Sequence, residues 1–313
     1  MTYSTPSTLE PGRSIMSREI VLITGASTGF GRDTAETLAR AGHTVFASMR
    51  NADGKNRGRA ETLRRLAATA NLKITPLELD VTSDASVERA VDAVLRDAGR
   101  IDVVINNAGV ALAGVSETFT AAQVRDMFEV NVLGLHRVMR AVLPTLRRQR
   151  DGLVINVGSI LGRVTFPFFG LYGASKFAVE ALTDSYRYEL SQLGVEVVLV
   201  QPSAYPTPMY ANARQPADAG RAADYGEVGR IPGQMLATFT EMFQGANAPN
   251  PHDVAEAIAR LVAQPRGSRP ARTIVGLPFG SDVVNQQTAP VQAQVVEGLG
   301  LRHLATVTDT VAA

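Results

Sequence analysis

Seven short runs of β-branched and apolar residues recur along this chain, separated by segments long enough to form helices. The runs are apolar at almost every position, which is typical of strands buried on both faces of a sheet. Parallel neighbours need a crossover connection, so the alternation predicts an α/β fold with a doubly wound, mainly parallel sheet. The predicted strands are Glu19–Thr24, His43–Ser48, Leu72–Leu79, Ile101–Asn106, Gly152–Gly158, Val195–Val200 and Ala271–Gly276.

Two regions interrupt this alternation. From about residue 204 to residue 244 the sequence holds Pro, Tyr, Met and several Ala without a strand pattern, and we expect a partly helical lid there. Residues 277–313 are predicted to form a C-terminal extension, with a short helical pattern around Pro290–Leu299 and a weakly structured tail. Residues 1–17, rich in Ser, Thr and Pro, are predicted to be flexible, which leaves one domain over residues 18–276.

The charge and the content of Cys and His exclude several kinds of partner. A formal net charge of +1 offers no strong field for a nucleic-acid backbone, and we interpret Arg57, Arg59, Arg64 and Arg65 as the solvated face of one helix. With no Cys and four scattered His, no metal site is expected. No apolar run is long enough to cross a bilayer and no secretory signal opens the chain, so we expect a cytoplasmic protein without a membrane partner.

A glycine-rich turn follows the first predicted strand directly. It reads Thr24-Gly25-Ala26-Ser27-Thr28-Gly29-Phe30-Gly31, and a helical pattern begins immediately afterwards. Glycines allow a tight turn and a close approach of backbone N–H groups to a pyrophosphate, which then lies at the positive end of the helix. The spacing of three glycines alone is a weak signal, and a turn needed only for packing is the alternative, but the position between strand and helix favours dinucleotide binding.

The end of the second predicted strand bears on the choice between NAD and NADP. Sites that prefer NAD place Asp or Glu there to bind the ribose 2′-hydroxyl. This strand ends at Met49-Arg50, without a carboxylate, and Arg50 offers a bidentate fork suited to a 2′-phosphate. We therefore predict NADP(H), the alternative being that Arg50 only lies on the surface and that the site does not discriminate. Asp53 is interpreted as a turn residue.

A second motif, Tyr172-Gly-Ala-Ser-Lys176, opens a helical segment and places a phenol and an ammonium on one helical face. Only three lysines occur among the 31 Lys and Arg residues, so a lysine at this offset indicates a need for a compact ammonium. Its charge would favour the tyrosinate and bring the pKa of the phenol nearer to the pH at which the protein works. Ser159, at the end of the fifth predicted strand, should emerge at the same edge of the sheet.

Taken together, these residues resemble the short-chain dehydrogenase/reductase family, in its compact single-domain branch, over about residues 18–276. The family motifs present are Thr24-Gly-x-x-x-Gly-x-Gly31, Asp80-Val81, Asn106-Asn107-Ala108-Gly109, Asn131, Ser159 and Tyr172-x-x-x-Lys176. The resemblance implies a Rossmann-type fold and catalysis by Asn131, Ser159, Tyr172 and Lys176. Asn131 would hold a helix distortion and a proton-relay water.

The resemblance also implies which residues contact the cofactor. Asp80 would approach the adenine, and a family Pro-Gly-x-x-x-Thr segment that meets the nicotinamide carboxamide corresponds here to Pro202-Ser203-Ala204-Tyr205-Pro206-Thr207. Serine replaces the family glycine, while Thr207 keeps the expected offset. The predicted cofactor-binding set is Gly25, Ser27, Gly29, Phe30, Gly31, Arg50, Asp80, Val81, Asn107, Ala108, Gly109, Tyr172, Lys176, Pro202 and Thr207.

The function implied is NADP(H)-dependent interconversion of a carbonyl compound and its alcohol, with Tyr172 as general acid/base. A non-catalytic NADP-sensing binding protein is the main alternative, but it would need neither Tyr172 nor Lys176. A sugar-nucleotide epimerase of the same superfamily fits the glycine spacing less well. Segments Ala121–Arg147 and Ser175–Leu190 carry apolar residues on more than one face, and the resemblance points to a homodimer or homotetramer.

The substrate side is indicated by the run Ile160–Phe169, which contains three phenylalanines and joins Ser159 to Tyr172. We expect Val110, Leu112, Tyr205 and Met209 to converge on the same cleft. Apolar walls favour a hydrophobic ketone, aldehyde or alcohol, such as a steroid, retinoid or polyketide, over a phosphorylated sugar or a carboxylate. Arg163 is the one nearby group that would pair with an anionic substrate instead.

Overall fold

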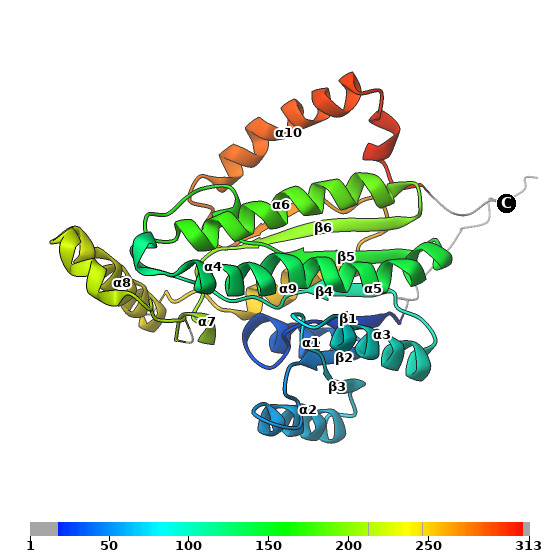
Figure 1. Cartoon of the computed structure of the whole chain (residues 1–313). Coiled ribbons are helices and arrows are strands. Elements are labelled where there is room, and N and C mark those ends of the chain that lie inside the picture. The colour runs from blue at the N-terminus through cyan, green and yellow to red at the C-terminus, as the bar shows by residue number, and fades with distance from the viewer. Residues whose placement is uncertain (1–17, 212, 246, 309–313) are drawn as a thin grey trace, which may run out of the picture.

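The computed structural model describes residues 18–211, 213–245 and 247–308. Seven strands form one sheet in the order β3-β2-β1-β4-β5-β6-β7, and every neighbouring pair is parallel (Figure 1). The strands are β1 Ile20–Ile23, β2 Thr44–Met49, β3 Ile74–Glu78, β4 Val103–Asn106, β5 Gly152–Val157, β6 Val195–Pro202 and β7 Arg272–Val275. The predicted doubly wound α/β fold is confirmed, and the strand order reverses between β1 and β4, where such folds bind their ligands.

Helices cover both faces of the sheet. One apolar cluster joins the sheet to α1 (Gly29–Arg40), α2 (Arg57–Thr69) and α9 (His252–Ala263). The cluster on the other face involves α3 (Asp84–Ala98), α5 (Gly134–Gln149) and α6 (Gly170–Ser191). Within β1, Val21 and Ile23 belong to the first cluster and Leu22 to the second, so consecutive strand residues are buried on opposite faces, as the unbroken apolar runs predicted.

The segment predicted to be a partly helical lid contains α7 (Pro208–Ala211), the short 3₁₀ helices Ala219–Tyr225 and Val228–Arg230, and α8 (Ile231–Gln244). Helix α8 has no buried residue, and it projects beyond the sheet in Figure 1. Shorter elements lie between the main strands and helices: the 3₁₀ turns Ser116–Thr118 and Ile160–Gly162, helix α4 (Ala121–Phe128) and a π-helical turn, Glu129–Leu133, that joins α4 to α5.

The C-terminal extension differs from its prediction. Helix α10 spans Ser281–Gly298 and so begins nine residues before Pro290, which lies inside it. The first half of α10 is rich in Asn, Gln and Thr and has no apolar periodicity, so the sequence pattern did not reveal it. Helix α10 lies outside α6 in Figure 1, and a last turn, Arg302–Ala305, returns to α6, where Gln192 donates to the carbonyl of His303 at 2.9 Å.

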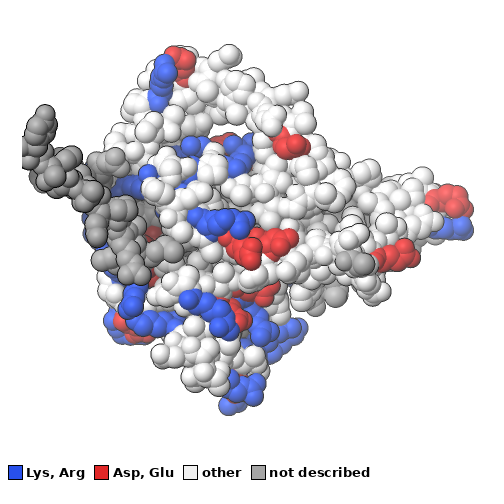
Figure 2. Space-filling view, turned by 180° about the vertical axis from the view of Figure 1, so that it is seen from behind, with Lys and Arg blue, Asp and Glu red and all other residues white. Residues whose placement is uncertain are grey.

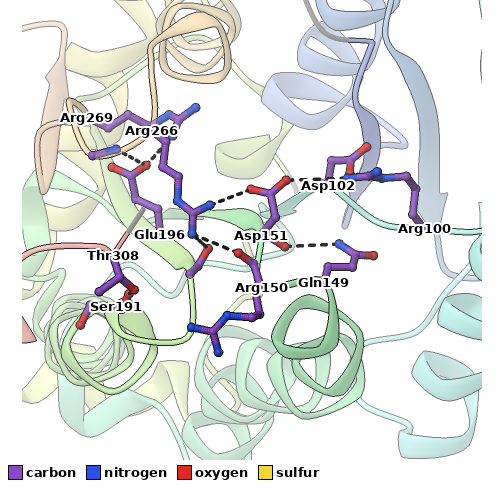
Figure 3. A network of polar contacts seen from close by, with 12 residues as sticks. Arg100, Asp102, Gln149, Arg150, Asp151, Ser191, Glu196, Arg266, Arg269 and Thr308 are labelled. Atoms are coloured by element: carbon purple, nitrogen blue, oxygen red, sulfur yellow. Dashed lines mark hydrogen bonds and ion pairs between the residues drawn. The ribbon is translucent and has the colours of Figure 1, made fainter. Parts of the chain in front are cut away.

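A polar network joins the chain segments at the amino edge of the sheet (Figure 3). Glu196 of β6 is 4% exposed, forms an ion pair with Arg269 and accepts from the amide of Gly267 at 3.2 Å. Asp102 pairs with Arg100 at 2.5 Å and accepts from the amide of Ile20 at 2.7 Å. These contacts hold β6 to the α9–β7 connection and β1 to the start of β4. They lie at the amino-terminal ends of the strands, opposite to the carboxyl ends where the candidate active site lies.

Charged residues are mixed over the surface. The face in Figure 2 carries Lys and Arg in several small groups interspersed with Asp and Glu. In the described part of the chain no helix has the length and apolar character that a membrane span needs. Over the same residues, no three His, Asp or Glu side chains gather as metal ligands would.

Candidate active site

The glycine turn after β1 has no room for a side chain at Gly25 or Gly31. Gly25 has a φ of +69°, and a Cβ there would lie 2.8 Å from Cα of Ala108. A Cβ on Gly31 would lie 2.6 Å from the carbonyl oxygen of Gly25. Asn107 fixes the turn, since its Nδ2 donates to the carbonyls of Thr24 and Gly25 at 2.9 and 3.1 Å. The turn leads into α1, which has no acidic residue in its first turn and so keeps the positive end of its dipole uncompensated.

A cleft of about 540 Å³ lies above this turn, at the carboxyl ends of β1, β2 and β4. Eleven of the predicted cofactor-binding residues line it: Gly25, Ser27, Gly29, Phe30, Arg50, Asp80, Val81, Asn107, Ala108, Gly109 and Thr207. Gly31 is buried behind the turn, and Pro202, Tyr172 and Lys176 line the adjoining pocket instead. The structure therefore brings the predicted set together in two adjoining spaces, which share the lining residues Phe30, Asn107, Ala111, Thr207 and Met209.

The end of the cleft next to β2 is basic. Arg50, Lys55 and Arg59 line it, and the buried Asn56 links two of them. Asn56 Nδ2 donates to the carbonyl of Arg50 at 2.8 Å, and Arg59 donates to Asn56 Oδ1 at 2.7 Å. The carboxylate of Glu78, at the end of β3, accepts from the amides of residues 51 and 52.

The residues of the Tyr-x-x-x-Lys motif and Ser159 meet in the adjoining pocket. Tyr172 and Lys176 lie in the first two turns of α6, with Lys176 Nζ 5.7 Å from the centre of the Tyr172 ring. Lys176 Nζ donates to the carbonyl of Val157 at 2.9 Å, and burial lowers the pKa of this lysine to about 8. Ser159 Oγ accepts from the amide of Leu161 at 3.1 Å and donates to the carbonyl of Pro202 at 3.5 Å.

Asn131 lies in the π-helical turn between α4 and α5, so the helix distortion expected at this residue is present. Its Oδ1 accepts from the amide of Val110 at 2.9 Å, and its Nδ2 donates to the Val110 carbonyl at 2.9 Å and to Ser175 Oγ at 3.0 Å. Asn131 and Lys176 both line a cavity of about 10 Å³. That volume is at the lower limit of what a cavity needs to hold one water.

The pocket beside Tyr172 has a volume of about 70 Å³ and is mostly apolar. Among the described residues Lys176 is its one charged lining group, and Phe30, Phe166, Phe169, Tyr205, Met209 and Phe239 supply much of the wall. Two of the four residues expected from flanking segments are therefore present. The expectation was wrong for the other two: Leu112 is 1% exposed in a packed apolar cluster, and Val110, held by Asn131, borders the cofactor cleft.

A family model described as "short chain dehydrogenase" matches residues 19–218. This chain belongs to the short-chain dehydrogenase family. Two relatives with different names are similar to this chain. A 3-ketodihydrosphingosine reductase of Bacteroides thetaiotaomicron is 34% identical over 83% of this chain and 89% of the length of that relative. The human 17-beta-hydroxysteroid dehydrogenase type 1 is 34% identical over 80% of this chain and 76% of its own.

Three solved structures illustrate the similarity of the fold. One from Streptomyces avermitilis is 30% identical, covers 91% of this chain and 97% of its own, and has a TM-score of 0.68. An alcohol dehydrogenase of Thermococcus sibiricus in complex with 5-hydroxy-NADP is 26% identical, with coverages of 83% and 96% and a TM-score of 0.66. A 3-ketoacyl-(acyl-carrier-protein) reductase of Brucella melitensis in complex with NADH is 25% identical, with coverages of 82% and 96% and a TM-score of 0.66.

Some residues of this short-chain dehydrogenase site were not predicted. Arg59 is exposed on α2, as its interpretation required, but it also lines the cleft, because the first turn of α2 follows closely after β2. Phe239 reaches the pocket from α8, and the recurrence of Ile231, Met235, Phe239 and Phe243 at intervals of four residues is the sequence signal for an apolar face there. Arg163 does not face the pocket as a spare cation, since its Nε lies 3.2 Å from Glu180 Oε2.

Proposed function

We propose that this short-chain dehydrogenase is an NADP(H)-dependent oxidoreductase that interconverts hydrophobic ketones or aldehydes with the corresponding alcohols. The observation that carries the proposal is the meeting of Ser159, Tyr172 and Lys176 in an apolar pocket that adjoins the cleft above the glycine turn. A nicotinamide cofactor, when bound, supplies or accepts the hydride. The residues of the chain must then hold the cofactor, orient the carbonyl and move one proton.

The cleft suits a dinucleotide on three grounds. Side chains at Gly25 and Gly31 would collide with neighbouring atoms, so both positions require glycine. The resulting tight turn allows a pyrophosphate to approach the backbone N–H groups at the start of α1. Arg50 and Arg59 offer guanidinium groups at the adenosine end, where a 2′-phosphate needs cations. Thr207 lines both the cleft and the pocket, as a residue at the nicotinamide must.

In the reductive direction Tyr172 would donate its proton to the carbonyl oxygen, and Ser159 would orient that oxygen through its hydroxyl. Lys176 uses one N–H for Val157, and its remaining donors suit ribose hydroxyls. In its charged form Lys176 would favour the tyrosinate. Asn131, with a water in the small cavity that it shares with Lys176, would return a proton to the site. In alcohol oxidation the same groups move the proton in the opposite direction.

The NADP preference is testable by replacing Arg50 with alanine and Met49 with aspartate together. The double change removes a charge-assisted contact to the 2′-phosphate and adds an acceptor for the 2′-hydroxyl, so the ratio of kcat/KM for NADPH over NADH should fall by about 100-fold. Arg64→Ala, on the exposed face of α2 and outside the cleft lining, should leave the ratio unchanged. An unchanged ratio in the double variant would indicate that Arg59, the other guanidinium group at this end of the cleft, determines the cofactor preference.

The substrate class follows from the apolar pocket wall. Phe166, Phe169, Phe239 and Met209 would surround the substituents of the reacting carbon, and the relatives include proteins named for a ketodihydrosphingosine and a hydroxysteroid. Charged substrates would lose solvation in such a pocket, where Arg163 is already paired with Glu180 and Lys176, the one charged lining group among the described residues, is assigned to the ribose. We therefore propose lipophilic carbonyl compounds, of steroid, retinoid, polyketide or long-chain type.

Oxidation of NADPH with a panel of carbonyl compounds tests this substrate class. Bulky apolar ketones should be reduced with a kcat/KM about 100-fold above that of small keto acids of similar reactivity. Efficient turnover of the keto acids alone would contradict the proposal. Binding of NADPH without turnover of any carbonyl compound would instead favour the alternative of a non-catalytic sensor.

Three further proposals concern the lid, the oligomeric state and the location of the protein. We propose that residues 204–244 act as the substrate lid, because Phe239 of α8 packs edge-on against Phe169 with ring centres 6.2 Å apart. A homodimer or homotetramer and a cytoplasmic location stay predictions from the sequence.

A further inference from the structure

A buried carboxylate that the proposed chemistry does not use lies one turn beyond Lys176. Glu180 is 4% exposed, and both of its oxygens have partners. Oε1 accepts from Gln201 Nε2, while Oε2 accepts from Arg272 Nε at 2.8 Å and lies 3.2 Å from Arg163 Nε. A carboxylate with so little solvent depends on these partners, because an unpaired buried charge is strongly unfavourable.

The partners of Glu180 belong to the segments on both sides of Ser159. Arg163 directly follows the 3₁₀ turn that Ser159 caps, and a Cβ on Gly162 in that turn would lie 2.9 Å from Glu180 Cγ. Gln201 directly precedes Pro202, whose carbonyl accepts from Ser159 Oγ. Glu180 therefore holds α6, which carries Tyr172 and Lys176, against the two backbone segments that surround the Ser159 hydroxyl.

The same network continues into the C-terminal helix. Asn285 of α10 donates from Nδ2 to Gln201 Oε1 at 2.8 Å. Gln201 is completely buried, so its carboxamide is fixed with the nitrogen toward Glu180 and the oxygen toward Asn285. Helix α10 buries only Ser281 and Val296 and lies outside α6 in Figure 1. Asn285 is thus a polar link between this peripheral helix and the sheet.

We propose that Asn285 is a positioning residue for the catalytic groups. Asn285 donates to Gln201 Oε1 and thereby keeps Gln201 Nε2 directed at Glu180. Glu180 then keeps the turn after Ser159 in a fixed position relative to α6. The C-terminal extension, through α10, is accordingly part of the machinery that aligns Ser159 with Tyr172. The kinetic and NADPH-binding parts of its test rest on the proposed function, whereas the exchange measurement does not.

Asn285→Asp tests the direction of the network. A carboxylate cannot donate to Gln201 Oε1, so the carboxamide must turn and present its oxygen to Glu180, which breaks the contact. We expect kcat to fall about tenfold or more, because small misplacements of reacting groups lower rates steeply. The affinity for NADPH should stay within about twofold, since no member of the network lines the cofactor cleft. Gln287→Ala, exposed on the same helix, is the matched control and should have wild-type kcat.

A second substitution should restore the contact. With Glu180→Gln added to Asn285→Asp, the new amide can donate to Gln201 Oε1 while Gln201 Nε2 donates to the new carboxylate, which reverses the whole chain of hydrogen bonds. The double variant should have a higher kcat than Asn285→Asp alone, although it lacks the pairing of Glu180 with Arg163 and Arg272. Additive losses from the two changes would contradict a directional network.

Hydrogen–deuterium exchange gives a readout that needs no substrate. In Asn285→Asp, amide exchange should rise in residues 159–163 and 170–176 and stay unchanged in α2. If exchange rises only in α10, or if the melting temperature falls while kcat and exchange near Ser159 stay at wild-type values, α10 is only packed on the surface and the proposal is overturned. Failure of every carbonyl substrate would overturn the proposed function and leave this exchange result to decide the inference.

Discussion

Tyr172→Phe is expected to lower the kcat of carbonyl reduction by about a thousandfold while NADPH still binds with nearly wild-type affinity. The ring of Tyr172 stays in place against Lys176 and the apolar pocket wall, so only the transferable proton is lost. Steady-state reduction of a ketone from the panel measures the first effect, and fluorescence titration of NADPH measures the second. A fall in kcat without loss of binding separates proton donation from a cofactor-holding role.

Tyr188→Phe is the matched control for this change. Tyr188 lies on the same helix, four turns beyond Tyr172, and lines neither the pocket nor the cleft. It should keep wild-type kcat and NADPH affinity. Near-normal turnover by Tyr172→Phe would refute the role of Tyr172 as general acid/base and would return attention to the sensor alternative.

Glu196→Gln is expected to reduce the unfolding free energy by about 3 kcal/mol, because it leaves Arg269 charged and without its carboxylate in a nearly buried network. The side chain of Arg269 is 10% exposed and that of Glu196 5%. Since this network lies at the amino edge of the sheet, away from Ser159 and Tyr172, kcat at moderate temperature should be unchanged (Figure 3). Denaturant titration followed by circular dichroism measures the loss of stability.

The comparison for this effect is Glu36→Gln. Glu36 pairs with Arg40 on the solvent side of α1, where the side chains are 33% and 53% exposed. Exposed pairs of this kind contribute at most about 0.5 kcal/mol. If Glu196→Gln were no more destabilising than Glu36→Gln, the amino-edge network would be a set of surface contacts without a role in holding β6 to the α9–β7 connection.

The sequence was most informative where burial is symmetrical. Each strand buried on both faces appears as an unbroken apolar run, and all seven predicted strands are present. Their ends were less exact: the third was predicted at Leu72–Leu79 and extends only over Ile74–Glu78, although Lys73 and Leu79 each still make one backbone hydrogen bond to β2, at 2.8 and 3.1 Å. The glycine turn and the Tyr172–Lys176 spacing were equally readable, since their backbone or helical geometry requires those residues at fixed offsets.

What the sequence could not reveal depends on contacts between distant segments. Glu180 and Gln201 are 21 residues apart and Gln201 and Asn285 are 84 apart, and each is an ordinary polar residue in its own segment. The early start of α10 was missed for a related reason, because its polar first half has no periodic apolar face. Only the folded chain, in which Gln201 near the end of β6 contacts both Glu180 of α6 and Asn285 of α10, makes these residues neighbours.

The arrangement of α8 has a consequence for how this protein can change over evolutionary time. The helix contributes Phe239 to the pocket and yet has no buried residue, while Ser159, Tyr172 and Lys176 are held by the sheet and α6. Substitutions on such a peripheral helix alter the unfolding free energy little. Selection can therefore reshape the pocket wall by varying α8 residue by residue, and each intermediate sequence keeps its fold and the arrangement of Ser159, Tyr172 and Lys176.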